Sequence, residues 1–196
     1  IKFLYNCNIN AIPVPNNTNS LKKYFIMHDI EGVILSGGND IFFKPKSKNI
    51  RINKKIKSLT FNRNLIEKKL INFASRKKIP IVGICRGFQF LNHYFKGKIS
   101  PITGHASTNH RINVKKDKIS TYEWTKLIDN KVNSYHNFGI KLKVLPKRFV
   151  CVASLDNNVE AAFNLNKRHM GIMWHPERKK NFSKKNIKLF KKLFNA

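Results

Sequence analysis

Cys85 has the most specific chemical context in this sequence, within the stretch Gly83-Ile84-Cys85-Arg86-Gly87. The apolar residues 79–84 before it predict a strand, and residues 86–95 after it predict a helix. A nucleophile on such a strand-to-helix turn projects above the sheet, and small residues two positions before and after it let the neighbouring backbones approach. The helix N-terminus favours thiolate over thiol and offers N–H groups to an oxyanion. This context predicts that Cys85 is a nucleophile rather than a buried apolar cysteine.

A base and a residue that orients it are predicted in Trp174-His175-Pro176-Glu177. Side chains two positions apart on an extended chain point the same way, and Pro176 pushes His175 towards extended geometry. The Glu177 carboxylate can then reach one imidazole nitrogen and leave the other facing a nucleophile. One His near one Glu would by default be a surface pair, but together with an elbow cysteine the pair indicates a catalytic triad.

A glycine turn, Ser36-Gly37-Gly38, follows the apolar residues 32–35. Such a turn exposes backbone N–H groups, one of which could complete an oxyanion hole with the N–H of Arg86. A phosphate-binding loop is the competing interpretation, but no Lys-Ser/Thr follows, so the nucleotide-triphosphatase motif is absent. A plain tight turn is the structural alternative.

The composition limits the class of protein. The chain has 196 residues, of which 41% are hydrophobic, so it can form one domain with a substantial core. It has no apolar run long enough for a membrane span, and its three cysteines are too few and too scattered for a disulfide framework or a zinc site. We therefore expect a cytoplasmic protein and take Cys7 and Cys151 as core residues.

The charge is strongly positive, with 39 Lys and Arg against 10 Asp and Glu, or a formal +29. A polyanion partner is one interpretation and compositional bias is the other. The lysine pairs are not interleaved with aromatic residues as in a single-strand binding groove, so nucleic-acid binding is not expected. An anionic small substrate remains compatible with the charge.

Apolar β-branched segments alternate with helical patterns, which predicts an α/β fold. The segments expected to be strands are 10–14, 32–35, 79–84, 149–154, 159–163 and 169–174. The expected helices are 21–27, 64–75, 86–95 and 183–194, and residues 43–57 are expected to form an exposed loop. The residues expected to face inward are Leu65, Ile66, Leu70 and Phe73 in the second helix and Ile187, Phe190, Leu193 and Phe194 in the last.

Three motifs now coincide in order: Ser36 to Asp40, Gly83 to Gln89, and His175-Pro176-Glu177. Together they resemble a class I glutamine amidotransferase domain and, more narrowly, the peptidase C26-like γ-glutamyl hydrolase branch. Arg86 and the segment Val132-Asn133-Ser134-Tyr135-His136 point to that branch. The resemblance covers nearly the whole chain. It implies a three-layer, flavodoxin-like fold with a central, mostly parallel sheet in a single domain, 1–196, and residues 1–6 would be the tail of a helix whose preceding strand is missing.

The resemblance also implies roles for individual residues. Cys85 would be the nucleophile, His175 the general base and acid, and Glu177 its orienter, while the backbone N–H groups of Gly38 and Arg86 would form the oxyanion hole. The residues expected to bind substrate are Gln89, which would hold the amino-acid end of a glutamyl group, and Tyr135, His136, Asn137 and Phe138. At Asn137 the sequence departs from the usual second His or Gln.

The resemblance implies no metal and no other cofactor. His105 and His110 could suggest a metal site, but no acidic residue is near them in the sequence, so they are expected to be loop or substrate-pocket histidines.

The expected activity is that of a cysteine hydrolase that cleaves a γ-glutamyl amide through a γ-glutamyl thioester and releases L-glutamate and an amine. The basic surface would suit a phosphorylated or nucleotide-linked small-molecule substrate, although the sequence does not specify the amine. An alternative is a glutaminase subunit that delivers ammonia to a separate synthase partner. A basic nucleic-acid-binding protein without activity is a third, which the intact set of Cys85, His175 and Glu177 argues against.

Overall fold

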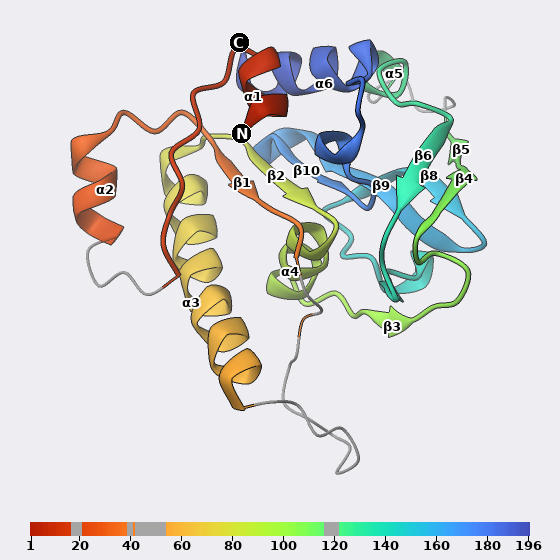
Figure 1. Ribbon diagram of the computed structural model, residues 1–196, viewed down its shortest axis with the longest axis horizontal. Coiled ribbons are helices and arrows are strands. Elements are labelled where there is room, and N and C mark those ends of the chain that lie inside the picture. Colours follow the sequence, from red (N-terminus) through yellow and green to blue (C-terminus); the bar gives the residue numbers. More distant parts are fainter. Residues whose placement is uncertain (17–20, 39–40, 42–53, 116–121) are drawn as a thin grey trace.

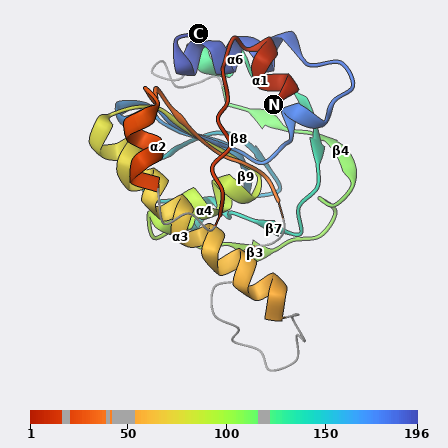
Figure 2. The ribbon, with the colours of Figure 1, turned by 60° about the vertical axis from the view of Figure 1, so that its left-hand side comes forward.

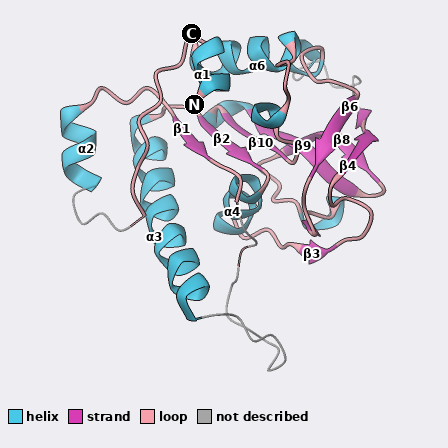
Figure 3. Cartoon of the chain, in the orientation of Figure 1, coloured by secondary structure: helices cyan, strands magenta, loops and turns pink. Residues whose placement is uncertain are grey.

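A six-stranded sheet forms the centre of the computed structural model, which describes the chain except residues 17–20, 39–40, 42–53 and 116–121 (Figure 3). The sheet has the strand order β1-β2-β10-β9-β8-β5. Its strands are β1 (Val33–Leu35), β2 (Ile81–Ile84), β5 (Asn113–Val114), β8 (Val150–Leu155), β9 (Asn158–Asn164) and β10 (His169–Ile172). Two small antiparallel sheets pair β3 (Ser100–Pro101) with β7 (Phe138–Gly139) and β4 (Thr108–Arg111) with β6 (Lys131–Ser134).

Helices cover both faces of the central sheet, which confirms the three-layer α/β prediction. The helices are α1 (Lys2–Asn6), α2 (Leu21–Met27), α3 (Lys54–Lys77), α4 (Arg86–Tyr94), α5 (Tyr122–Thr125) and α6 (Lys184–Phe194), with short 3₁₀ turns at η2 (Leu142–Val144), η3 (Leu165–Lys167) and η4 (Pro176–Arg178). Helices α1 and α6 pack on one face and α3 and α4 on the other (Figures 1 and 2). One core contains Phe3 and Phe190, and the other contains Ile71 and Leu91.

The sheet is mixed. Strands β1, β2 and β10 run parallel to one another, whereas β9, β8 and β5 continue the sheet in antiparallel pairs. The carboxyl ends of the three parallel strands therefore meet at one edge. In open α/β sheets this is the edge at which ligands bind.

Two of the expected elements are wrong. Residues 10–14 form no strand, because Pro13 and Pro15 lack the N–H groups that a ladder requires. Residues 43–57 are expected from the sequence to form an exposed loop. Residues 43–53 lie outside the described part of the chain, and residues 54–57 belong to α3, which begins at Lys54.

Leu65 is 45% exposed rather than buried, since it lies about 140° around the helix from the buried Leu70. The helix expected over 64–75 is longer than predicted, since α3 spans Lys54–Lys77, and the remaining predicted helices and strands lie within a few residues of their expected bounds. No helix in the described ranges is both long and apolar enough to cross a bilayer.

Glycines allow α4 to lie directly on the sheet. Gly171 of β10 stands opposite Gly83 of β2 in the parallel register. A Cβ at Gly171 would lie 1.9 Å from the Phe88 ring, and a Cβ at Gly83 would lie 2.6 Å from the Phe88 backbone nitrogen. On the helix side, a Cβ at Gly87 would lie 1.9 Å from the carbonyl oxygen of Leu35. Any larger residue at these positions would push the first turn of α4 away from the strands.

We expect Gly171→Ala to destabilise the fold by about 1–3 kcal/mol, because the added methyl group overpacks against the Phe88 ring. Phe88→Leu alone should also be destabilising, since it removes buried ring atoms. The double variant should lose less than the sum of the two, because the shorter side chain makes room for the methyl group. Urea unfolding of the four proteins measures this coupling, and strictly additive losses would contradict the proposed contact.

Candidate active site

Cys85 occupies a strained turn at the carboxyl end of β2. Its backbone has φ 49° and ψ −105°, in the positive-φ region that residues other than glycine rarely adopt. The Cys85 N–H donates to the carbonyl of Ile172 at 2.7 Å, which ties the turn to β10, and α4 begins at the next residue. The side chain is 4% exposed. This strand–turn–helix geometry is that of a nucleophile elbow.

His175 follows β10 and is paired with Glu177. The imidazole is 1% exposed, and its Nδ1 lies 2.7 Å from Oε1 of the partly exposed Glu177. Because a carboxylate can only accept, the proton of the neutral ring lies on Nδ1 and Nε2 keeps its lone pair. An imidazole held in this tautomer can accept a proton at Nε2.

The Cys85 elbow and His175 leave neighbouring parallel strands at the same edge of the sheet. Ile84 and Ile172, the last residues of β2 and β10, are register partners. From the next strand, β1, the glycine turn reaches the same place: a Cβ at Gly37 would lie 2.5 Å from Cε1 of His175. The fold thus gathers the elbow, the His–Glu pair and the glycine turn at one edge, whereas Asn39 and Asp40 of that motif lie outside the described residues.

A polar clamp that the sequence analysis missed holds the backbone of His175. The Asn133 side chain donates from Nδ2 to the His175 carbonyl at 2.9 Å, and its Oδ1 accepts from the His175 N–H at 2.8 Å. Asn133 is buried in β6, 42 residues away in sequence. It belongs to the segment 132–136, on which the resemblance to the γ-glutamyl hydrolase branch partly rests, but nothing in the sequence places it against His175.

A second buried network supports the glycine turn and the start of α4. Glu67, the one acidic residue of α3, accepts from Arg86 Nη1 at 2.6 and 2.7 Å and from Arg63 Nε at 2.8 Å. Arg86 also donates to Asn64 Oδ1 at 2.7 Å. Burial lowers the pKa of the Arg86 guanidinium, and the Glu67 charge opposes that shift. A lone acid in a basic helix is the sequence signal that could have drawn attention to Glu67.

Through Arg63 this network reaches the glycine turn. Arg63 Nη2 donates to the Ser36 carbonyl at 2.5 Å. Gly38 has φ 154°, and a Cβ there would lie 2.4 Å from Arg63 Nη1, so both its backbone conformation and this contact favour glycine. Within the described ranges, neither the N–H of Gly38 nor that of Arg86 donates to a backbone carbonyl. Among the described residues, the two N–H groups predicted to form the oxyanion hole therefore have no backbone acceptor.

Four of the predicted pocket residues, Gln89, Tyr135, His136 and Phe138, contact one another or His175. Gln89 Nε2 donates to the Phe138 carbonyl at 2.8 Å, and His136 Nδ1 lies 3.0 Å from the same oxygen. The Tyr135 ring meets the His175 ring edge-on at a centroid distance of 5.6 Å. Asn137 is exposed, and its backbone carbonyl accepts from the Ile102 N–H at 2.9 Å.

His105 lies in a loop, as expected, whereas His110 lies in β4, and both have an acidic neighbour that is distant in the sequence. The fold brings the buried carboxylate of Glu160, in β9, to 3.3 Å from His105 Nδ1 and 3.6 Å from His110 Nε2. His136 completes the cluster, with its Nε2 3.9 Å from Glu160 Oε1. Burial lowers the pKa of His136 to about 4. Burial raises the pKa of Glu160, but the neighbouring histidines outweigh it, so the net shift is downwards.

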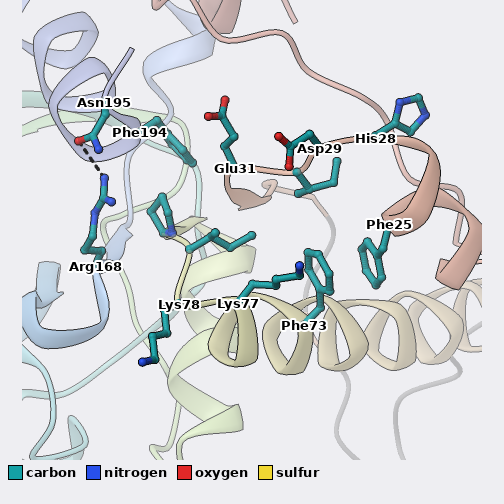
Figure 4. Close-up of a pocket in the computed structure, with 13 residues that line it drawn as sticks. Phe25, His28, Asp29, Glu31, Phe73, Lys77, Lys78, Arg168, Phe194 and Asn195 are labelled. Atoms are coloured by element: carbon teal, nitrogen blue, oxygen red, sulfur yellow. Dashed lines mark hydrogen bonds between the residues drawn. The ribbon is translucent and has the colours of Figure 1, made fainter.

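A hollow of about 380 Å³ lies at the opposite edge of the sheet (Figure 4). Pro80 and Arg168, two of its lining residues, immediately precede β2 and β10. Arg168 donates to Asn195 Oδ1 at 3.0 Å (Figure 4). This hollow is therefore remote from the Cys85 elbow and lies at the amino ends of the parallel strands, where open α/β sheets seldom bind ligands.

Comparisons with known proteins agree with this fold. The model of the family described as Peptidase C26 matches residues 2–177. The chain is 36% identical over 185 residues to the gamma-glutamyl-CDP-amidate hydrolase of Campylobacter jejuni, covering 94% of this chain and 80% of that protein. It is 26% identical to one of the subunits of the glutamine-hydrolyzing GMP synthase of Methanococcus maripaludis, covering 84% of this chain and 72% of that protein.

Among solved structures, the glutaminase domain of Trypanosoma brucei CTPS with bound acivicin is 12% identical and superposes with a TM-score of 0.62, covering 99% of this chain and 86% of that one. This likeness concerns the fold alone. The family match over most of the chain, together with the 36% identical relative, shows that the chain belongs to the peptidase C26 family.

Proposed function

We propose that this protein hydrolyses a γ-glutamyl amide, with Cys85 as nucleophile, His175 as general base and acid, and Glu177 as the residue that orients His175. One observation carries the proposal: the positive-φ elbow at Cys85 shares a sheet edge with an imidazole whose Nδ1 lies 2.7 Å from a carboxylate. Because Glu177 holds Nδ1, the basic Nε2 is left for the thiol.

In the first half of the reaction, His175 Nε2 takes the thiol proton and the sulfur attacks the side-chain carbonyl carbon of the glutamyl group. The negative charge on that carbonyl oxygen is met by the N–H groups of Gly38 and Arg86; one such donor contributes roughly 3 kcal/mol. The nine-residue helix α4 adds the positive end of its dipole. The C–N bond then breaks, His175 protonates the leaving amine, and a γ-glutamyl thioester remains on Cys85.

In the second half, His175 Nε2 accepts a proton from water, and the hydroxide attacks the thioester carbonyl. The carbon–sulfur bond breaks, glutamate leaves and the thiol is restored. Gln89, fixed to the Phe138 carbonyl, and the adjoining residues Tyr135 and His136 form the wall proposed to hold the glutamyl group. Asn137, between His136 and Phe138, is proposed to line the same pocket. A thiol nucleophile also fits the cytoplasmic, reducing location that we propose.

We further propose that the amine is a phosphate-bearing small molecule. Two features support an anionic leaving group: the formal charge of +29, and the exposed Arg178 guanidinium stacked 4.6 Å from the centre of the Tyr135 ring, which itself adjoins His175. The C. jejuni relative bears the name of a hydrolase of gamma-glutamyl-CDP-amidate, so a nucleotide-linked amide is the first substrate to test.

A glutaminase that delivers ammonia to a separate synthase is the second candidate, which the 26% identity to the M. maripaludis GMP synthase chain favours. The two candidates share the chemistry and differ in the amine. A glutaminase of that kind should prefer free glutamine and respond to its synthase, whereas the hydrolase should prefer substituted amides without a partner.

The test compares wild type, Cys85→Ala and the matched control Cys151→Ala on three substrates: glutamine, a neutral γ-glutamyl amide and γ-glutamyl-CDP-amidate. We expect Cys85→Ala to lower kcat by at least about 10⁴-fold with an unchanged circular dichroism spectrum, because the nucleophile is lost. Cys151→Ala, which lies in β8 outside the proposed site, should keep full activity. Of the three substrates, γ-glutamyl-CDP-amidate should give the wild-type protein its highest kcat/KM. Normal turnover by Cys85→Ala would refute the proposal. A preference of the wild type for glutamine would favour the second candidate.

Asn133 is proposed as a positioning residue for His175, and Asn133→Leu should lower kcat by at least about tenfold while changing KM little. It should also cost about 1–3 kcal/mol of stability, because the two backbone groups of His175 lose their buried partners. Asn92→Leu is the control: Asn92 is also buried, near the end of α4, and bonds to the Lys98 carbonyl at 3.1 Å. Steady-state kinetics and urea unfolding together distinguish a positioning role of Asn133 from a purely structural one. If the role were purely structural, Asn133→Leu would lower the stability but leave kcat equal to that of Asn92→Leu.

A further inference from the structure

A cluster of three imidazoles and one carboxylate, all buried except the partly buried His110, lies where β4 and β6 approach β9, on the side of the molecule away from α3 (Figure 1). Glu160 of β9 is 0% exposed, and the carboxylate is surrounded by His105, His110 and His136. The triad proposed above uses none of these four residues, and of the four only His136 also belongs to the wall proposed to hold the glutamyl group. A fully buried carboxylate needs a compensating charge or hydrogen-bond donors.

The hydrogen bonds of the cluster are incomplete. Among the described residues, the two oxygens of Glu160 and the two ring nitrogens of His110 lack a hydrogen bond of ordinary geometry, although His105 Nδ1 and His110 Nε2 lie 3.3 and 3.6 Å from the carboxylate. The tautomer of His136 can be assigned. The Phe138 carbonyl, 3.0 Å from its Nδ1, can only accept, so Nδ1 carries the proton of the neutral ring. Its Nε2 lone pair is therefore directed at the cluster, 3.9 Å from a Glu160 oxygen that is also an acceptor. Two acceptors that face each other repel unless a proton, a water molecule or a metal ion lies between them.

The spacing of these atoms fits a transition-metal ion. Zinc binds His nitrogen and carboxylate oxygen at about 2.0–2.2 Å, so two ligand atoms at the tetrahedral angle lie roughly 3.3–3.5 Å apart. The observed separations are 3.3 Å from His105 Nδ1 to Glu160 and 3.6 Å from His110 Nε2 to Glu160. One ligand atom from each of the three residues can be chosen so that all lie within 4.8 Å of one another.

We propose that His105, His110 and Glu160 bind one Zn²⁺ ion, with His136 Nε2 adjacent as the fourth ligand. The hydrogen bond from His136 Nδ1 to a backbone carbonyl is the outer contact that metal-binding histidines commonly make, since it fixes the tautomer and the ring. The backbone of His105 is also held in advance, because its carbonyl accepts from Ser134 Oγ at 2.5 Å and from the His136 N–H at 3.3 Å. A phosphate does not fit here, since the Glu160 carboxylate would repel it.

The role of this ion would be structural. It would join the β4–β6 pair to β9 and fix the segment from His136 to Phe138, whose carbonyl accepts from Gln89. Metal binding itself does not depend on the proposed hydrolase activity; only its effect on the glutamyl pocket rests on that proposal.

The experiment uses the full chain without a polyhistidine tag, in the Cys85→Ala background so that the elbow thiol cannot bind metal. Inductively coupled plasma mass spectrometry should find about one Zn per chain. After stripping with a chelator, Zn²⁺ added against a chromophoric competitor should rebind and raise Tm, and Co²⁺ should give the visible absorption of a tetrahedral site. Glu160→Gln should weaken Zn²⁺ binding at least about 100-fold, because it removes the charged ligand while keeping the shape.

His110→Asn is the second variant, for use if Glu160→Gln does not fold, since the His110 side chain is more exposed than that of His105. His28→Asn, in the hollow at the other edge of the sheet, is the matched control and should bind Zn²⁺ as tightly as its parent. Absence of zinc together with no rebinding tighter than about micromolar would overturn the proposal. Equal affinity in the parent and in a folded Glu160→Gln or His110→Asn variant would do the same. Zinc binding in the Cys85→Ala background is independent of turnover, so the proposed function can fail while the metal site stands.

Discussion

The close approach of α4 to β2 and β10 is the constraint on which the rest of this structure depends. Gly83, Gly87 and Gly171 leave no side chain between the first turn of the helix and the strands, and Cys85 must then turn through a positive φ to connect them. The strain at Cys85 is therefore imposed by packing on both sides of it. The same approach aims the helix N-terminus at the edge where His175 and the glycine turn arrive.

Two buried polar networks keep the arriving segments in place. Asn133 fixes the backbone of His175 from β6, and the group of Glu67, Arg63 and Arg86 fixes the glycine turn from α3. Each network connects two or more elements of the fold. The residues proposed to take part in the chemistry are therefore held in place by side chains that do not take part in it. A buried polar network that loses one partner leaves polar groups without hydrogen bonds, which lowers the stability of the fold. Substitution of any member of these networks is therefore expected to be destabilising.

The sequence was sufficient for the parts of the site that are encoded locally. The elbow at Cys85 and the pairing of His175 with Glu177 depend on spacings of a few residues, and the glycines flanking Cys85 mark the close approach from the helix side. Gly171, Asn133 and Glu160 act across strands far apart in sequence, and no local pattern brings them to their partners. The strand expected over residues 10–14 is absent for a local reason, because Pro13 within the segment and Pro15 just after it lack the N–H groups that a ladder requires.

The direct measurement of the central claim is mass spectrometry of the Cys85 peptide from enzyme quenched in acid within milliseconds of mixing with a γ-glutamyl amide. The account predicts that a fraction of the peptide gains the mass of one glutamyl group, lost on treatment with hydroxylamine as expected of a thioester, while the peptides containing Cys7 and Cys151 stay unmodified. Full release of glutamate with no adduct on Cys85, or with the adduct on another cysteine, would contradict it.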